Sequence, residues 1–170
     1  MADSTEPFLH SPIQTKIDWA KNFFKREGKR LLKDHQLVNL LEALKAAIHN
    51  SRRQMIESGI VDWCRECDEK EGGSCCGAGL ERHYSGSLLL INLLLGQTLP
   101  RRRETPAGCY FLSGKGCILL AREVLCINYM CKKITTEIKP DQLSVLRKAE
   151  GEEIHLLFQL NERLKKRFRS

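Results

Sequence analysis

Apolar residues recur at helical spacing near both ends of the chain, and this pattern predicts amphipathic helices. The first helix is expected from residue 13 to about residue 32. Its apolar face carries Ile13, Ile17, Trp19, Ala20, Phe23, Phe24 and Leu31. A second helix is expected to follow Asp34, a candidate N-cap, and to stop near Gly59. Its apolar face carries Leu37, Leu40, Leu41, Leu44, Ala47 and Ile48.

Residues 132–170 return to the same helical pattern. The apolar positions are Leu143, Leu146, Ile154, Leu157, Leu160 and Leu164. Asp141 is a candidate N-cap, and Gly151 is expected to divide the segment into two helices. The basic residues 165–167 come at the end, where the dipole of a helix favours positive charge.

The middle of the chain, residues 64–131, has a different pattern. Tight loops are predicted by its glycines, which are Gly72, Gly73, Gly77, Gly79, Gly108, Gly114 and Gly116. One short helix is expected at about residues 87–95. The apolar run at residues 88–95 is far shorter than the about 20 residues that cross a bilayer, so we expect a core helix and no membrane span.

Length and charge bound the class of protein. The 170 residues are about the size of one domain, and the formal net charge is +7 with thiols counted as neutral. Because metal-bound thiolates are negative, this basic balance overstates attraction to nucleic acid. Residues 1–14 lack a basic segment followed by an apolar one, so no signal peptide is expected. We therefore expect a cytoplasmic protein, in which thiols stay reduced.

Eight cysteines in a reducing compartment favour metal or redox chemistry over a disulfide framework. The candidate metal ligands are Cys64, Cys67, Cys75, Cys76, Cys109, Cys117, Cys126 and Cys131. A C-x2-C spacing lets two thiolates reach one metal from a single turn. The adjacent pair suits two different metals, one polynuclear cluster, or one ligand beside a free thiol, because neighbouring side chains point apart. The sequence leaves this division open.

Thiolates select zinc and iron–sulfur clusters over harder ions. The adjacent pair and the irregular spacing favour an iron–sulfur cluster, of the 4Fe–4S type, over zinc or over a mononuclear or polynuclear iron site. The predicted fold class is mostly α, with amphipathic helices around a loop-rich, cysteine-ligated metal core. We expect a single domain, residues 1–170, with N-terminal helices (1–63), a cysteine-cluster core (64–131) and C-terminal helices (132–170).

The segments CRECDEKEGGSCC and GCYFLSGKGCILLAREVLCINYMC resemble the YkgJ-like cysteine-cluster family, the zinc/iron-chelating C-x-x-C-x-x-x-C-C domain. All eight cysteines fall in the family's order over residues 64–131. Phe111, Leu112, Gly116 and Arg122 also match its pattern. The chain departs from the family where Glu123 replaces a proline, and in a longer loop between Cys67 and Cys75. The resemblance implies cysteine-bound zinc or iron. Related clusters occur in flagellin lysine methylases, which keeps a protein-modifying role open.

Histidines and basic runs add little to this picture. His83 could ligate a metal, but a surface or structural role is favoured, and His10, His35, His49 and His155 have no ligand spacing. The short basic run at residues 101–103 reads as a solvated loop, and Trp19 and Trp63 read as core residues.

The expected function is that of a cytoplasmic, cysteine-ligated metalloprotein with a redox or an accessory (maturation) role. Another protein is favoured as its partner over nucleic acid. The alternatives are a structural-zinc binding module for protein or nucleic acid, and a metal-dependent protein-modifying enzyme. No acid–base constellation assigns catalytic residues, so enzymatic activity is left open.

Overall fold

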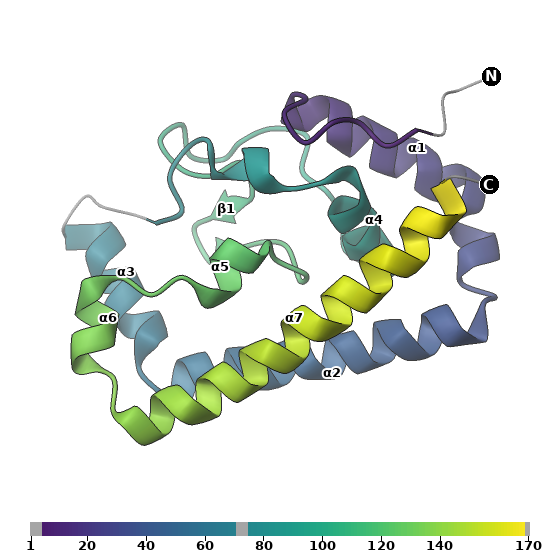
Figure 1. Ribbon diagram of the computed structural model, residues 1–170. Helices are drawn as coiled ribbons and strands as arrows, with labels where there is room; N and C mark the ends of the chain where they lie inside the picture. Colours follow the sequence, from purple (N-terminus) through teal and green to yellow (C-terminus); the bar gives the residue numbers. More distant parts are fainter. Residues whose placement is uncertain (1–4, 71–74, 169–170) are drawn as a thin grey trace.

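The protein is built on two long helices that run in opposite directions. The computed structural model describes residues 5–70 and 75–168. Helix α2 (His35–Glu57) packs along helix α7 (Pro140–Phe168) over much of its length (Figure 1). Both helices turn a leucine-rich face into one core, where their buried members include Leu37, Leu41, Leu44, Leu157, Leu160 and Leu164. This pair of helices forms the base on which the other elements lie.

A second layer covers one end of the pair. Helix α1 (Ile13–Leu31) packs against helix α4 (Gly86–Leu94), and α4 also contacts α7. Helix α4 is buried on nearly all sides, which explains its continuous apolar run. Its N-terminus is capped twice, because the Ser85 hydroxyl accepts from the N–H of Leu88 (3.1 Å) and the Glu6 carboxylate accepts from the N–H of Ser87 (2.6 Å).

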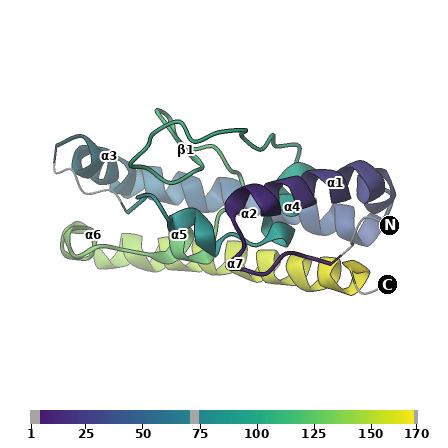
Figure 2. The same cartoon turned by 90° about the horizontal axis from the view of Figure 1, so that it is seen from above.

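Short elements lie over the rest of the α2–α7 pair, with α3 and α6 at the end away from α1 and with β1 and α5 nearer the middle, as Figures 1 and 2 show. They are α3 (Ile60–Lys70), the 3₁₀ helix η1 (Leu80–His83), β1 (Leu112–Ser113), β2 (Gly116–Cys117), α5 (Val124–Asn128) and α6 (Lys132–Glu137). The two strands pair antiparallel, with Leu112 opposite Cys117. A second apolar cluster lies here, made of Ile60, Ile134, Ile138 and Leu146, with Trp63 and Met130 packed against it.

The structure confirms the mostly helical class and the first two helices. Asp34 is the N-cap of α2, since its carboxylate accepts from the N–H groups of Gln36 and Leu37. The short helix is confirmed as α4, and Trp19 lies in the core. Within the described ranges, no helix combines the length and the apolar character that crossing a bilayer requires.

Three expectations about the elements are wrong. Helix α7 begins at Pro140, so Asp141 lies inside its first turn rather than at the N-cap. Gly151 does not divide α7, because it lies on an exposed face where a glycine costs a helix only about 1 kcal/mol. Cys64 and Cys67 lie on helix α3 rather than on a loop, so the expected boundary at residues 63–64 falls inside a helix. The predicted loop glycines Gly72 and Gly73 lie outside the described residues.

Leu31 and Leu32 offer a matched test of this packing, because the first is 4% exposed and the second is 44% exposed. We expect Leu31→Ala to lower the free energy of unfolding by about 2–5 kcal/mol, since it leaves a cavity between α1 and the core. Leu32→Ala should change it by no more than about 0.5 kcal/mol. Urea denaturation of both variants measures the difference, and equal losses would contradict the described end of α1.

Asp34 also joins the start of α2 to the end of α7. Its carboxylate accepts hydrogen bonds from Arg163 (3.0 Å) and Arg167 (3.0 Å) on the last turns of α7. The bond from Arg163, supported by the Leu37 N–H and by Arg167 against an opposing effect of desolvation, lowers the pKa of Asp34 from 3.8 to about 2. Because the folded-state pKa is depressed, the unfolded chain binds the proton more readily, and stability falls as the pH drops.

The prediction concerns the interval from about pH 4 to about pH 2, where the unfolded Asp34 is protonated and the folded one is still ionised. Asp34→Asn keeps a capping oxygen but cannot titrate. We expect the wild-type protein to lose more stability than Asp34→Asn as the pH is lowered through this interval. Urea midpoints measured at pH 5 and pH 3 test this, and parallel losses in the two proteins would refute it.

Candidate metal centre

All eight cysteines lie in the described part of the chain, and the structure joins no two of them in a disulfide. Cys64 and Cys67 lie on α3, and the adjacent pair Cys75–Cys76 lies in the turn before Gly77. The later four lie on or next to the elements that follow. Cys109 precedes β1, Cys117 ends β2, Cys126 lies on α5 and Cys131 is the N-cap of α6. The cysteines of residues 64–131 therefore lie on short elements and the loops between them, and none lies on α1, α2, α4 or α7.

Backbone hydrogen bonds connect the segment around Cys76 to the segment around Cys109. The N–H of Cys109 donates to the carbonyl of Cys76 (2.6 Å), and the N–H of Ala78 donates to the carbonyl of Ala107 (2.9 Å). Between them, Gly77 and Gly108 form an isolated antiparallel bridge. The bridge sets Cys76 beside Cys109, although 32 residues separate them in the sequence.

Cys109, Cys117 and Cys126, called here the inner group, lie against the main core. Cys109 is 5% exposed, and Cys117 and Cys126 pack against the same apolar cluster. Pairing of β1 with β2 returns Cys117 toward Cys109, because the N–H of Leu112 donates to the Cys109 carbonyl (3.0 Å) and Leu112 lies opposite Cys117.

Burial has the largest effect on the pKa values of Cys109 and Cys126 in the inner group. It raises the pKa of Cys109 to about 11 against a hydrogen bond at Phe111, and the negative charge of Glu81, followed by the thiols of Cys117 and Cys76, adds to this rise. Burial likewise raises the pKa of Cys126 to about 11, against a hydrogen bond from Tyr84. Closely spaced buried thiols that resist ionisation one at a time are the donors that a cation can deprotonate together.

Tyr84 donates from its hydroxyl to the sulfur of Cys126 (3.7 Å). The side chain is 1% exposed, and its ring lies 4.8 Å from that of Phe111, centroid to centroid. Burial, reinforced by the thiols of Cys117 and Cys126, raises the pKa of Tyr84 above its ordinary value. Tyr84 therefore stays protonated and keeps donating to sulfur at neutral pH.

Cys64, Cys67 and Cys131 are called here the outer group, and of these Cys131 packs against the second apolar cluster. Cys64 and Cys67 are three residues apart on α3 and share a face. The start of α6 meets this helix, since Lys133 pairs with Glu66 (3.5 Å). Burial raises the pKa of Cys64 to about 11, and the thiols of Cys75, Cys131, Cys76 and Cys67 raise it further.

The segment between Cys117 and Cys126 is held by polar side chains from two helices. Arg52 on α2 donates to the carbonyls of Leu119 (2.7 Å) and Leu120 (3.0 Å). Asn92 on α4, which is fully buried, accepts from the N–H groups of Leu120 (2.9 Å) and Ala121 (3.0 Å) and donates to the Ala121 carbonyl (2.8 Å). These bonds hold the segment that leads from β2 to α5.

Two guanidinium groups influence the inner group electrostatically. Burial, together with repulsion from Arg122, lowers the pKa of Arg52, while Cys117, Glu153 and Tyr84 oppose that change. Arg122 also acts on the thiol of Cys126. The buried carboxylate of Glu153, hydrogen-bonded by Ser51, completes the layer between the helices and the sulfurs. Positive charge is thus available where thiolates would form.

Within residues 5–70 and 75–168, no three or more histidine, cysteine, aspartate or glutamate side chains are arranged to hold a metal ion as they stand. The cysteine sulfurs of these residues therefore do not converge on one point.

Other residues singled out from the sequence lie away from the sulfurs or have structural partners. The five histidines, His10, His35, His49, His83 and His155, are all exposed. Arg103 is not a solvated loop residue, because it pairs with the buried Glu81 and donates to the Gly108 carbonyl. The sequence pattern did not single out Asn92 or Arg52. Asn92 is the polar residue inside the apolar run at residues 88–95, and that position was a signal for a buried hydrogen-bonding role.

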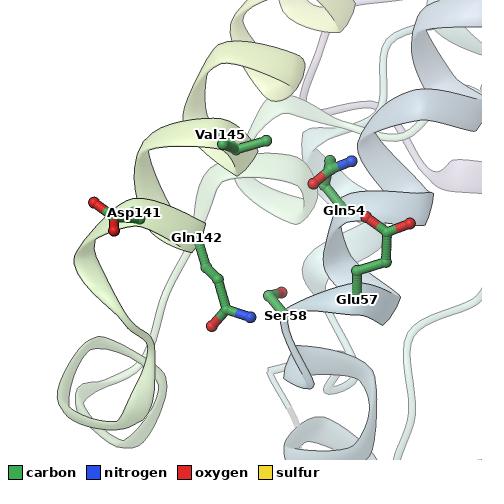
Figure 3. Close-up of a pocket in the computed structure, with 6 residues that line it drawn as sticks. All are labelled: Gln54, Glu57, Ser58, Asp141, Gln142 and Val145. Atoms are coloured by element: carbon green, nitrogen blue, oxygen red, sulfur yellow. The ribbon is translucent and has the colours of Figure 1, made fainter.

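One pocket lies apart from the cysteines, between the end of α2 and the start of α7 (Figure 3). Its lining residues are Gln54, Glu57, Ser58, Asp141, Gln142 and Val145. Its one hydroxyl, that of Ser58, donates to the Met55 carbonyl (3.1 Å), and the lining includes no histidine or lysine, so this pocket does not replace the cysteines as the candidate site.

No protein-family model, no curated protein and no solved structure matches the chain. The resemblance of residues 64–131 to the cysteine-cluster family stays a prediction.

Arg52 and Arg53 are adjacent, but only Arg52 holds the 119–120 carbonyls, whereas the side chain of Arg53 is 65% exposed. We expect Arg52→Met to lower the free energy of unfolding by about 1.5–3 kcal/mol, because two carbonyls lose a charged donor. Arg53→Met should change it by no more than about 0.5 kcal/mol. Chemical denaturation of the two variants checks this. Equal stability of both would show that Arg52 does not anchor the segment.

Proposed function

We propose that the chain is a cysteine-ligated metalloprotein that binds iron as an iron–sulfur cluster and serves a redox or an accessory, maturation-type role. The observation that carries the proposal is that eight thiols, none joined in a disulfide, lie on the short elements and loops of residues 64–131, where backbone pairing brings Cys76 beside Cys109. The chemistry of the donors supports it, because thiolates favour iron–sulfur clusters and zinc.

The surroundings of the inner group favour iron–sulfur. Tyr84 donates to a cysteine sulfur, and two guanidinium groups lie nearby. Hydrogen bonds to sulfur and burial are the means by which a protein sets the reduction potential of a cluster. A 4Fe–4S cluster takes four cysteines, and eight cysteines allow for such a site.

Zinc is the alternative, and the same donors support it. Four thiolates form the closed tetrahedral set of a structural zinc site. The protein would then be a binding module for a protein or nucleic acid. A metal-dependent, protein-modifying enzyme is a further alternative and requires an open coordination position on the metal.

The proposal places the protein in the cytoplasm, since thiols persist in a reducing compartment. A protein partner is favoured over nucleic acid because basic side chains of the C-terminal turns are engaged within the chain. Arg163 and Arg167 both bind Asp34. The basic net charge also shrinks once thiolates bind metal.

Purification without oxygen, followed by metal and sulfide analysis and an absorption spectrum, tests the proposal. We expect iron, acid-labile sulfide and a broad visible band, and we expect His83→Ala, which changes an exposed side chain, to keep all three. Cys117→Ser should lose metal and melt at a lower temperature, because binding and folding are coupled.

Two results would contradict this function. Folded protein without metal, prepared anaerobically from cells supplied with iron and zinc, would remove the metalloprotein role. Colourless protein with zinc and no iron would replace the iron–sulfur cluster by the structural-zinc alternative.

A further inference from the structure

We propose that Cys76 and Cys109 form a site of reversible oxidation, at which a peroxide converts the two thiols into a disulfide. Both cysteines are in the reduced state in this structure, since neither is joined to another cysteine by a disulfide. The inference rests on the backbone pairing between the two residues. It goes beyond the proposed function and does not depend on bound metal.

Cys76 and Cys109 lie directly opposite each other in an antiparallel pairing. Gly77 pairs with Gly108 in an antiparallel bridge, so the next position along the two segments sets Cys76 opposite Cys109. The N–H of Cys109 donates to the carbonyl of Cys76 (2.6 Å). Opposite residues that are hydrogen-bonded in this way typically have Cα atoms about 5.5 Å apart and side chains on one face. A disulfide spans Cα separations of about 4.4–6.8 Å, so such a pair closes with little backbone movement.

Neighbouring cysteines do not share this register. The pairing of β1 with β2 sets Cys117 opposite Leu112 rather than opposite a cysteine. Cys75 is exposed, whereas Cys76 packs against the main apolar cluster, to which Cys109 belongs. Packing holds a side chain in one orientation. Register and packing therefore both make Cys76, and not Cys75, the partner of Cys109.

A buried carboxylate ties the two cysteine-bearing segments together. Glu81 is 6% exposed, and it accepts from the N–H of Gly79 (2.9 Å) on one segment and from the N–H of Tyr110 (3.3 Å) on the other. Arg103 pairs with Glu81 and donates to the carbonyl of Gly108. These bonds hold the two thiols opposite each other before any S–S bond forms, and such positioning favours their reaction with each other.

The oxidation needs a two-electron acceptor, which a peroxide supplies. The half-buried Cys76 sulfur attacks one oxygen of hydrogen peroxide, the O–O bond breaks, and Cys76 becomes a sulfenic acid while water leaves. The sulfur of the more deeply buried Cys109 then attacks the Cys76 sulfur, the S–O bond breaks, and a second water leaves. The protons of both thiols leave with the departing oxygens. Two thiols and one hydrogen peroxide thus give one disulfide and two waters.

Such a disulfide is transient in a reducing compartment and can report oxidation there. A dithiol returns it to two thiols by thiol–disulfide exchange. A metal ion ligated by Cys76 or Cys109 would block the oxidation, and the disulfide would block ligation, because both use the same sulfur atoms. This competition rests on the proposed function, whereas the disulfide itself does not.

Peptide mapping of the oxidised full-length protein tests the pair. The protein is treated with a chelator and a dithiol, freed of both without oxygen, and exposed to hydrogen peroxide, after which N-ethylmaleimide caps the remaining thiols. Cleavage by trypsin after lysine and arginine should then release residues 71–82 linked to residues 104–115. Fragmentation of the linked peptides between positions 75 and 76 should place the bond on Cys76. Treatment with a dithiol should abolish the link.

Cys75→Ser and Cys76→Ser are matched variants, because they change neighbouring thiols of the same tryptic peptide. We expect Cys75→Ser to keep the link to Cys109 and Cys76→Ser to lose it. Protein unfolded in urea should show no preference for this link, since the preference comes from the pairing in the fold.

Three results would overturn the inference. They are a link that maps to Cys75, a preference for other pairs of cysteines, and the same products from folded and unfolded protein. Fragmentation of the wild-type peptides decides between Cys75 and Cys76 even if Cys76→Ser does not fold. Because the mapping uses chelator-treated protein, metal-free protein on purification would refute the proposed function and leave this result unaffected.

Discussion

The positions of Cys117 and Cys126 depend on one constraint, the double anchoring of the segment at residues 119–121. This segment lies between Cys117 and Cys126 and has no regular pairing of its own. Arg52 from α2 and Asn92 from α4 satisfy its carbonyl and N–H groups, and the side chains of Leu119 and Ala121 are fully buried beside them. A buried irregular segment is stable only when its backbone groups are hydrogen-bonded. Two side chains on the helical scaffold therefore determine where a loop presents two sulfurs.

Buried polar groups with partners inside the chain also occur on α2 and α7. Glu153 and Ser51 join α7 to α2 by a buried hydrogen bond, and Arg147 pairs with the buried Glu150 on α7. Burial raises the pKa of Glu150, and Arg147 opposes that rise. Such groups are costly unless each has a partner, so they fix one arrangement of the helices. Polar contacts as well as leucine packing therefore hold α2 and α7 in one arrangement. These two helices in turn support the elements that carry the cysteines.

The spacing of apolar residues in the sequence predicted the helices that bury one face and expose the other. The faces of α1 and α2 and the cap at Asp34 follow from residues a few positions apart. It missed α3, because the cysteines at 64 and 67 were interpreted as loop ligands although they occupy helical positions beside Trp63. It divided α7 at Gly151, where an exposed position tolerates glycine. The eight candidate ligands could be named from composition, but their neighbours could not, because the bridge between Gly77 and Gly108 and the role of Asn92 are long-range pairings.

Differences in burial determine what thiols at the two places can do. Metal exchange and electron transfer to a partner both require approach, and approach is possible only where few layers cover the sulfur. Cys109 is buried in the main core, whereas Cys64, on the short helix α3, and Cys75 are exposed. Those helices make few contacts with the α2–α7 base compared with the pairing of α2 and α7 themselves. The end of the molecule formed by α3 and α6 is therefore where a cysteine sulfur is most accessible to another molecule. Its charged side chains include Glu66 and Lys133, which pair with each other and link the two helices.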